Sequence, residues 1–308
     1  MAVLIDGKAV ASKIRAQVAE RVARLCERGI VPCLATVLVG DDPASETYVR
    51  MKGNACERVG MVSRRITLPK DATQEQLMRT IRELNEDPAV HGILLQHPVP
   101  GHLDEREAFD AIAIDKDVDG VTTLGFGRAA FDLPGFRSCT PQAIIRLLDE
   151  YEIPIEGRRA VVVGRSPILG KPVAHLLLNR NATVTICHSR TQDLPQVVRE
   201  ADILVAAVGR PKFIQGEWVK EGVVVMDAGY NPGNIGDVDF DACVGKASAI
   251  TPVPGGVGPV TIATLLENTV AAAEARVRGG KGEVTAREWK QPLDRREKRP
   301  CHVAQGLL

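Results

Sequence analysis

Tyr48 and Lys52 lie four positions apart in a segment, residues 45–59, whose pattern predicts a helix. Residues at this spacing share one helix face, so the phenol and the ammonium group would lie side by side. Such a pair can transfer protons if neighbouring groups adjust the pKa of the lysine. A tyrosine ring packed on a lysine stem is the more common explanation of this spacing. The pair therefore needs partners before it indicates a catalytic site.

Two polar segments could supply these partners. Gln96 ends the apolar run at residues 92–96, which predicts a buried strand. Parallel sheets place ligand-binding groups at such strand ends. Residues 115–120, with the sequence DKDVDG, form a dense acidic loop. This loop does not indicate a calcium site, because the EF-hand spacing and its terminal glutamate are missing.

A glycine-containing loop at residues 164–172 follows an apolar run at 160–163 and opens a predicted helix at 172–178. Glycine lets the backbone turn sharply toward a phosphate, and the start of a helix favours the anion. The loop differs from the common GxGxxG pattern, because Ser166 replaces the second glycine and Gly170 comes one position late. A phosphate-binding loop and an ordinary glycine turn both fit this segment.

The tip of the next predicted strand, residues 183–187, bears on the choice of nucleotide. Sites for NAD commonly carry an acidic residue here, about 20 residues past the glycine loop, to bind the ribose hydroxyl. This tip instead carries His188, Ser189 and Arg190. A hydroxyl and a cation, together with Arg165, suit a 2′-phosphate, which favours NADP over NAD. A solvated strand end is the structural alternative.

The elements that must position these residues follow an α/β rhythm. Short apolar runs alternate with helical patterns, which predicts parallel sheets built from β-α-β units. Thr73 and Gln76 fit a capping box at the start of a helix that runs to about residue 85, and Ser45 is expected to cap the helix at 45–59. The expected strands are residues 31–39, 65–68, 92–96, 160–163, 183–187, 203–208, 223–226 and 249–251.

We therefore predict an α/β fold with two domains of parallel-sheet type and a cleft between them. Residues 1–120, completed by a helix at 261–278, would form a catalytic domain, and residues 140–260 would form a Rossmann-like domain. The composition changes after Arg278. Residues 279–308 have few apolar anchors, so a flexible, polar, basic tail is expected there.

Composition excludes several classes of protein. The 308 residues include 39 basic and 39 acidic side chains, and this balance argues against a nucleic acid or an anionic membrane as the main partner. No apolar run is long enough to span a bilayer, and no signal peptide is evident. The seven cysteines are scattered without a CxxC spacing, which favours reduced thiols in the cytoplasm. Between Arg276 and His302 lie nine basic and four acidic residues, so the rest of the chain has a net charge of −5.

Five motifs occur together, in a fixed order, over about residues 1–275. They are GDDPAS at 40–45 followed by Tyr48, Val49 and Lys52, GILLQ at 92–96, DKDVDG at 115–120, GRS at 164–166 and TPVPGGVGPVT at 251–261. In this set the chain resembles the bifunctional methylenetetrahydrofolate dehydrogenase/methenyltetrahydrofolate cyclohydrolase family. Because all five motifs agree, chance similarity is a poor explanation.

The resemblance implies a defined activity in one-carbon metabolism and purine biosynthesis. The family oxidises 5,10-methylenetetrahydrofolate to the methenyl cation by hydride transfer to a nicotinamide cofactor. It then hydrolyses the cation to 10-formyltetrahydrofolate in the same cleft. A homodimer is also expected from the family, with tetrahydrofolate derivatives as ligands and without a metal.

The resemblance also implies roles for single residues. Lys52 matches the catalytic lysine of the hydrolytic step, and Gln96 matches its orienting partner. Tyr48 matches the residue that stacks on the folate, and Asp119 matches the carboxylate that binds the pterin. Cofactor contacts are expected at Gly164, Arg165, Ser166, Ser189, Arg190 and Tyr230, the last at a position that is often aliphatic. Substrate contacts are expected at Pro254, Gly255 and Gly256, where glycine permits close approach, although a tight inter-domain turn would use the same residues.

Other interpretations stay open at this point. His97 stands where many relatives carry an aliphatic residue; it could titrate near neutral pH, but a hydrogen-bonded structural histidine is the favoured interpretation. His91 and His102 could join it around a metal, yet no paired carboxylate or thiolate spacing supports one. A shikimate-type dehydrogenase and a non-catalytic NADP- or folate-binding regulator are the alternative functions, and Lys52 argues against the regulator.

Overall fold

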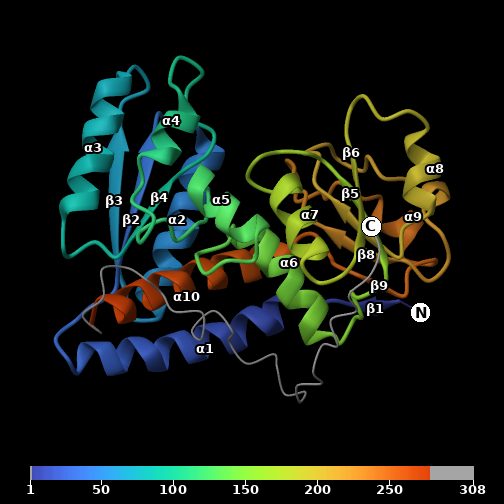
Figure 1. The fold of residues 1–308 in the computed structure, drawn as a ribbon, viewed down its shortest axis with the longest axis horizontal. Coiled ribbons are helices and arrows are strands. Elements are labelled where there is room, and N and C mark those ends of the chain that lie inside the picture. Colours follow the sequence, from blue (N-terminus) through green and yellow to red (C-terminus); the bar gives the residue numbers. More distant parts are fainter. Residues whose placement is uncertain (1, 278–308) are drawn as a thin grey trace, which may run out of the picture.

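The computed structural model describes residues 2–277, so the expected tail at 279–308 lies outside the described residues. The first sheet has the strand order β3-β2-β4, and the second has the order β1-β9-β8-β7-β5-β6. All strand pairs within both sheets are parallel. The α/β fold with two parallel sheets is therefore confirmed, and the sheets lie in two lobes (Figure 1).

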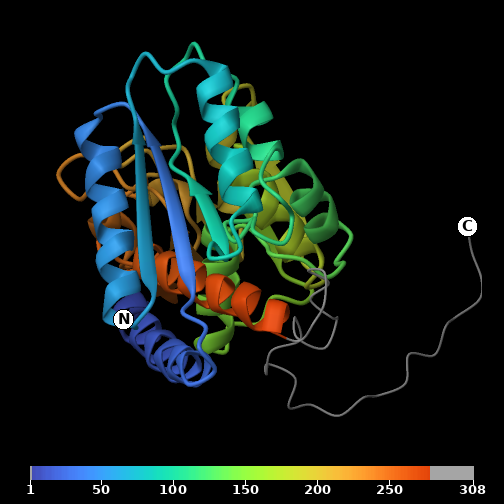
Figure 2. The same ribbon diagram turned by 90° about the vertical axis from the view of Figure 1, so that its left-hand side faces the viewer.

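The lobe of the first sheet is built from β2 (Cys33–Val39), β3 (Val62–Leu68) and β4 (Gly92–Leu95). Every residue of the central strand β2 is buried, whereas edge strand β3 has no buried residue. Helices α2 (Pro43–Arg58) and α3 (Gln74–Glu86) lie on opposite sides of this sheet (Figure 2). Two short helices follow β4, namely α4 (Glu105–Asp110) and α5 (Thr123–Ala130).

The other lobe holds the six-stranded sheet and its covering helices. Its strands are β5 (Arg159–Val163), β6 (Thr183–Cys187), β7 (Ile203–Ala206), β8 (Val224–Asp227) and β9 (Ala249–Ile250), joined at one edge by β1 (Val3–Leu4). Its helices are α6 (Cys139–Glu150), α7 (Gly170–Leu178), α8 (Leu194–Arg199), the short 3₁₀ turn η1 (Gly216–Trp218) and α9 (Phe240–Cys243).

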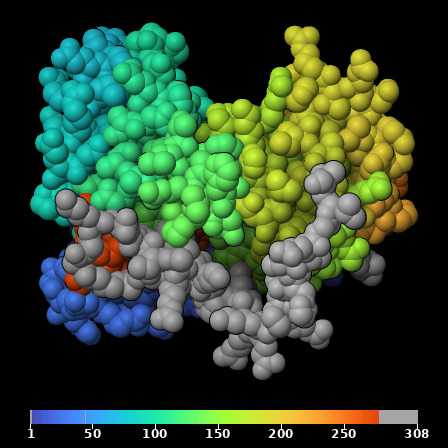
Figure 3. All heavy atoms as spheres, in the orientation of Figure 1, coloured from blue at the N-terminus to red at the C-terminus, as the bar shows by residue number. Residues whose placement is uncertain are grey.

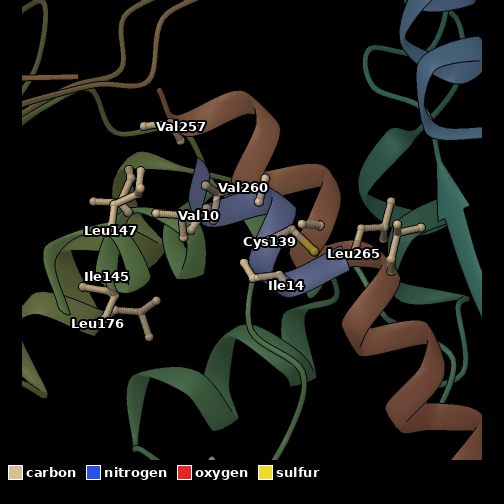
Figure 4. Close-up of a cluster of buried hydrophobic side chains, with 14 of the residues drawn as sticks. Val10, Ile14, Cys139, Ile145, Leu147, Leu176, Val257, Val260 and Leu265 are labelled. Atoms are coloured by element: carbon tan, nitrogen blue, oxygen red, sulfur yellow. The ribbon is translucent and has the colours of Figure 1, made fainter. Parts of the chain in front are cut away.

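Two long helices connect the lobes, α1 (Gly7–Cys26) and α10 (Val257–Val277). Both run beneath the two lobes in Figure 1. Side chains from α1, α6 and α10 meet in the largest buried cluster, as Val10, Leu147 and Val260 show in Figure 4. This shared core sets the position of one lobe relative to the other.

Local sequence explains where the helices begin. The Asp42 side chain accepts a hydrogen bond from the Ser45 N–H at 2.8 Å, so Asp42, and not Ser45, caps α2. Pro43 takes the first turn, where its missing N–H costs nothing. The predicted capping box of Thr73 and Gln76 is confirmed at α3.

Two features of the fold were not predicted from the sequence. Helix α1 was not expected, although its buried residues Val10, Ile14 and Val18 recur every four positions. The pairing of β1 with β9, in the sheet of the other lobe, was not predicted either. The two residues of β1 are too few to carry a sequence signal of their own.

Candidate active site

The carboxyl end of β4 and one face of α2 converge in the first lobe. Lys52 Nζ, on α2, donates a hydrogen bond to Gln96 Oε1 at 3.0 Å. Gln96 is held at the strand end, where its backbone N–H donates to Val37 O at 2.8 Å. Its side chain is buried, and Lys52 and Tyr48 are half-buried. Two of the expected site residues, Lys52 and Gln96, are thus in direct contact.

The acidic loop brings Asp119 to the same place. The Asp119 carboxylate is close enough to Lys52 and to the Cys139 thiol to affect their pKa values, and the thiol donates a hydrogen bond to Val118 O at 3.3 Å. Gly120 follows with a φ of +64°, and a Cβ there would lie 2.4 Å from the backbone of Arg137 and Ser138. The loop therefore packs so tightly against the segment before α6 that only glycine fits at this position.

The structure separates the three carboxylates of this loop. Asp115 lies 3.9 Å from Arg276. Asp117 is fully buried and accepts hydrogen bonds from the backbone N–H groups of Val121 and Thr122, each at 3.0 Å. Of the three, only Asp119 interacts with Lys52. The three carboxylates that are close together in the sequence therefore have separate partners in the structure. One of them, Asp119, lies at the site.

Burial controls the charges at this site. It lowers the pKa of Lys52 below 10.5, and the attraction of the Asp119 carboxylate and the Cys139 thiolate form opposes this shift without cancelling it. It raises the pKa of Asp119, against the opposing effects of Lys52 and the Cys139 thiol. A lysine with a lowered pKa is neutral in a larger fraction of molecules, so it can accept a proton.

The glycine loop of the second lobe links β5 to α7. Gly164 has a φ of +131°, and a Cβ there would lie 2.1 Å from Ala207 O. The Ser166 hydroxyl accepts hydrogen bonds from Leu169 N at 3.2 Å and Gly170 N at 3.3 Å. A Cβ on Gly170 would lie 2.2 Å from Gly164 O, so both glycines are needed for the loop to close. Arg165 projects from it as an exposed cation.

The tip of β6 lies beside this loop, because Gly164 N donates to Cys187 O at 2.9 Å. Arg190 N donates to His188 Nδ1 at 3.1 Å, which holds a tight turn after the strand. Ser189 and Arg190 are exposed. Within residues 2–277, neither Arg165 nor Arg190 forms an ion pair. Two uncompensated cations and a hydroxyl beside a glycine loop fit the phosphate groups of a dinucleotide.

The expected substrate-contact loop leads into α10. A Cβ on Gly7, at the start of α1, would lie 1.8 Å from Gly256 O, so this loop packs directly on α1. Gly255 has a φ of +114° and, like Gly256, is buried, whereas Pro254 is exposed. The contact with α1 explains the two glycines by a tight turn between the lobes. Pro254 is exposed and so is accessible to a ligand.

Several contributors were missed from the sequence. The Asn268 amide, on α10, donates to Val118 O at 2.8 Å and so supports the loop that carries Asp119. Fully buried Asp237 accepts from the N–H groups of Val208 (2.6 Å), Gly209 and Arg210 (2.9 Å each) after β7. A single buried acidic side chain leaves no periodic pattern in the sequence, so only the tertiary structure shows these contacts.

The histidines have separate partners. His97 Nδ1 lies 2.8 Å from Glu105 Oε1, and His102 Nε2 lies 2.9 Å from Ala72 O. Buried His91 accepts a hydrogen bond from Cys33 N at 3.2 Å. Over residues 2–277 there is no group of three or more His, Cys, Asp and Glu side chains placed to hold a metal ion. In the same range no helix combines the length and apolar character needed to cross a membrane.

Models of known protein families match both lobes of the chain. Residues 5–119 match the family model of the tetrahydrofolate dehydrogenase/cyclohydrolase catalytic domain, and residues 138–277 match that of its NAD(P)-binding domain. The chain belongs to the tetrahydrofolate dehydrogenase/cyclohydrolase family. The family resemblance and the bifunctional enzyme inferred from sequence are thereby confirmed, in preference to a shikimate-type enzyme or a binding protein.

Individual relatives cover nearly the whole described chain. "Bifunctional protein FolD" of Shouchella clausii is 65% identical over 274 residues, which are 89% of this chain and 98% of the relative. The crystal structure of the Campylobacter jejuni bifunctional enzyme FolD superposes with a TM-score of 0.88 at 46% identity, covering 90% of this chain and all of that one. A Trypanosoma brucei dehydrogenase-cyclohydrolase, solved in complex with NADP and an inhibitor, has a TM-score of 0.87 at 41% identity and covers 90% of this chain and 99% of that one.

Proposed function

We propose that the enzyme oxidises 5,10-methylenetetrahydrofolate to 5,10-methenyltetrahydrofolate with NADP and then hydrolyses the product to 10-formyltetrahydrofolate. The observation that carries this proposal is the cluster of Lys52, Gln96 and Asp119. This cluster lies in the first lobe and the glycine loop lies in the second, and Figure 3 shows a hollow between the two lobes. Oxidation removes a hydride from the substrate carbon, and water then adds to the cation with ring opening and release of one proton.

Lys52 handles the proton of the hydrolytic step in this proposal. Water addition to the methenyl cation requires a base, and burial of Lys52 raises the fraction of the neutral amine. Gln96 orients the amine through the 3.0 Å hydrogen bond. Asp119 binds the pterin, and Tyr48, one helical turn before Lys52, stacks on it. The exposed Pro254 and the backbone of Gly255 and Gly256 complete the folate side.

The nicotinamide cofactor supplies the hydride acceptor when bound. The chain's own residues would hold it at Gly164, Arg165 and Ser166 on the glycine loop, and at Ser189 and Arg190 on the tip of β6, with Tyr230 nearby. The uncompensated charges of Arg165 and Arg190 support a 2′-phosphate and hence NADP. The Trypanosoma brucei relative was solved with NADP, which agrees with this choice.

We also propose a division of labour between residues 1–120 with α10, which bind folate, and residues 140–260, which bind NADP. A cytoplasmic homodimer is part of the proposal. The cysteines of the described chain are all free, in keeping with a reducing compartment. Strand β6 is an edge strand with Ile186 38% exposed, so it could pair with a second copy. If the proposed homodimer is wrong, sedimentation analysis of the purified enzyme will show a monomer.

An absorbance assay with methylenetetrahydrofolate and either NADP or NAD tests the main proposal. We expect reduction of NADP with formation of the methenyl compound, followed by its hydrolysis to the formyl product. No cofactor reduction, or equal rates with NADP and NAD, would contradict the activity or the cofactor choice, respectively.

A further inference from the structure

Two tyrosine rings from opposite lobes meet at the site. Tyr48 lies on α2, in the folate lobe, and Tyr230 follows β8, in the other lobe (Figure 1). Their ring centroids are 5.8 Å apart, and the ring planes are inclined at 71°. This distance and angle are those of a favourable edge-to-face aromatic pair. Tyr48 is half-buried, whereas Tyr230 is 53% exposed.

The segment that carries Tyr230 is held firmly by its own residues. The Tyr230 hydroxyl donates to Asn234 Oδ1 within the same loop. Asn231 N donates to Ile235 O at 2.8 Å, and Asn231 Nδ2 donates to buried Asp237 at 3.0 Å. The Tyr230 ring is half exposed, is carried on an anchored loop and meets a ring of the other lobe. It therefore presents a preformed contact surface.

We propose that Tyr230 is a positioning residue for the folate site. Its ring supports the Tyr48 ring from across the cleft and keeps it in the orientation that stacks on the pterin. This inference rests on the stacking role proposed for Tyr48. It goes beyond a cofactor contact, because the NADP lobe would then contribute to folate binding even when no nicotinamide is bound.

Methenyltetrahydrofolate hydrolysis without nicotinamide separates the two roles of Tyr230, because that step needs no cofactor. Tyr230→Leu removes the ring, whereas Tyr230→Phe keeps it and loses only the bond to Asn234. An aromatic pair contributes roughly 0.5–1.5 kcal/mol beyond simple burial, which corresponds to about a 2- to 12-fold change. In this cofactor-free reaction we expect Tyr230→Leu to raise KM by about this factor with a much smaller effect on kcat, and Tyr230→Phe, which keeps the ring, to raise KM by much less.

A double-mutant cycle shows whether Tyr230 acts through Tyr48. If it does, Tyr230→Leu has little further effect on KM in a Tyr48→Leu background. Phe131→Leu is the matched control, because Phe131 is an aromatic side chain that is 80% exposed and belongs to the end of α5. We expect this control to leave both activities and KM unchanged. Thermal unfolding of each variant confirms that the fold is retained.

The results distinguish this inference from the proposed function. If the wild type hydrolyses the methenyl compound but Tyr230→Leu has an unchanged KM without nicotinamide, or if the two substitutions are additive, the inference is wrong. If the wild type does not hydrolyse the compound, the proposed function is wrong. In that case, calorimetry of tetrahydrofolate binding to the same variants tests the inference. The inference predicts that the dissociation constants change in the same pattern as expected for KM.

Discussion

Replacing Lys52 tests the proposed hydrolytic mechanism most directly. Lys52→Met keeps much of the side-chain length but cannot accept a proton. General acid–base catalysis contributes about 10²- to 10⁴-fold, so we expect the hydrolysis rate to fall by at least about 100-fold. Folate binding should stay largely intact, because Tyr48 and Asp119 are unchanged. Undiminished hydrolysis of the methenyl compound by this variant would refute the role of Lys52.

A second variant separates the proton from the charge. Lys52→Arg keeps a cation, but a guanidinium does not lose its proton at ordinary pH. We expect hydrolysis to fall about as far as in Lys52→Met, since both lack a neutral amine. If Lys52→Arg instead retains most of the activity, the lysine acts as a positive charge and not as a base. For the wild type, the lowered pKa of Lys52 predicts that hydrolysis increases as pH rises toward that pKa and the amine becomes neutral.

The cost to the fold must be measured alongside the rate. Lys52→Met removes the donor to Gln96 Oε1, whose residue is 8% exposed. An unsatisfied buried acceptor costs about 1–3 kcal/mol. At roughly 2–4 °C per kcal/mol for a chain of this size class, the melting temperature should fall by about 2–12 °C. Assays well below the melting temperature of the variant therefore report on catalysis and not on unfolding.

Three further predictions concern the cofactor, acid stability and the loop after Asp119. Arg190→Ala should raise KM for NADP more than KM for NAD in steady-state assays, whereas equal losses would remove the argument for a 2′-phosphate. Burial lowers the pKa of His91 from 6.5 to about 4, so the folded state favours the neutral ring, and stability is lost as pH falls below 6.5. Denaturant unfolding of His91→Gln should be less sensitive to pH than that of the wild type by about 1.5 kcal/mol between pH 6.5 and 5, and parallel curves would contradict this. Gly120→Ala should destabilise the protein by more than about 2 kcal/mol in thermal melts, because its Cβ would lie 2.4 Å from backbone atoms; Gly29→Ala, also at positive φ but with nothing within 4 Å, is the control that should lose much less.

Much of the fold was readable from local patterns. Strand 183–187 and the capping box of Thr73 and Gln76 were predicted as observed, since strand propensity and capping depend on neighbouring residues. Strand ends moved by a few residues, as at β7, predicted to run to residue 208 and observed to end at Ala206. Helix α2 is capped by Asp42 because Pro43 determines its first turn, a local signal that the sequence contained.

What the sequence determined by itself is the set of chemical groups and the elements that carry them. Spacing placed Tyr48 and Lys52 on one helix face and Gln96 at a strand end. The family resemblance pointed to Gln96 as the partner of Lys52 and to Asp119 at the site, but residue patterns alone did not show which groups meet, and the tertiary structure decided this. It brings Lys52 to Gln96, selects Asp119 from three carboxylates and places Tyr230 against Tyr48. These contacts join segments far apart in the chain, and their geometry is set by the core that α1, α6 and α10 share. Long-range packing of this kind has no local signature, which is why it could not be predicted from residue patterns.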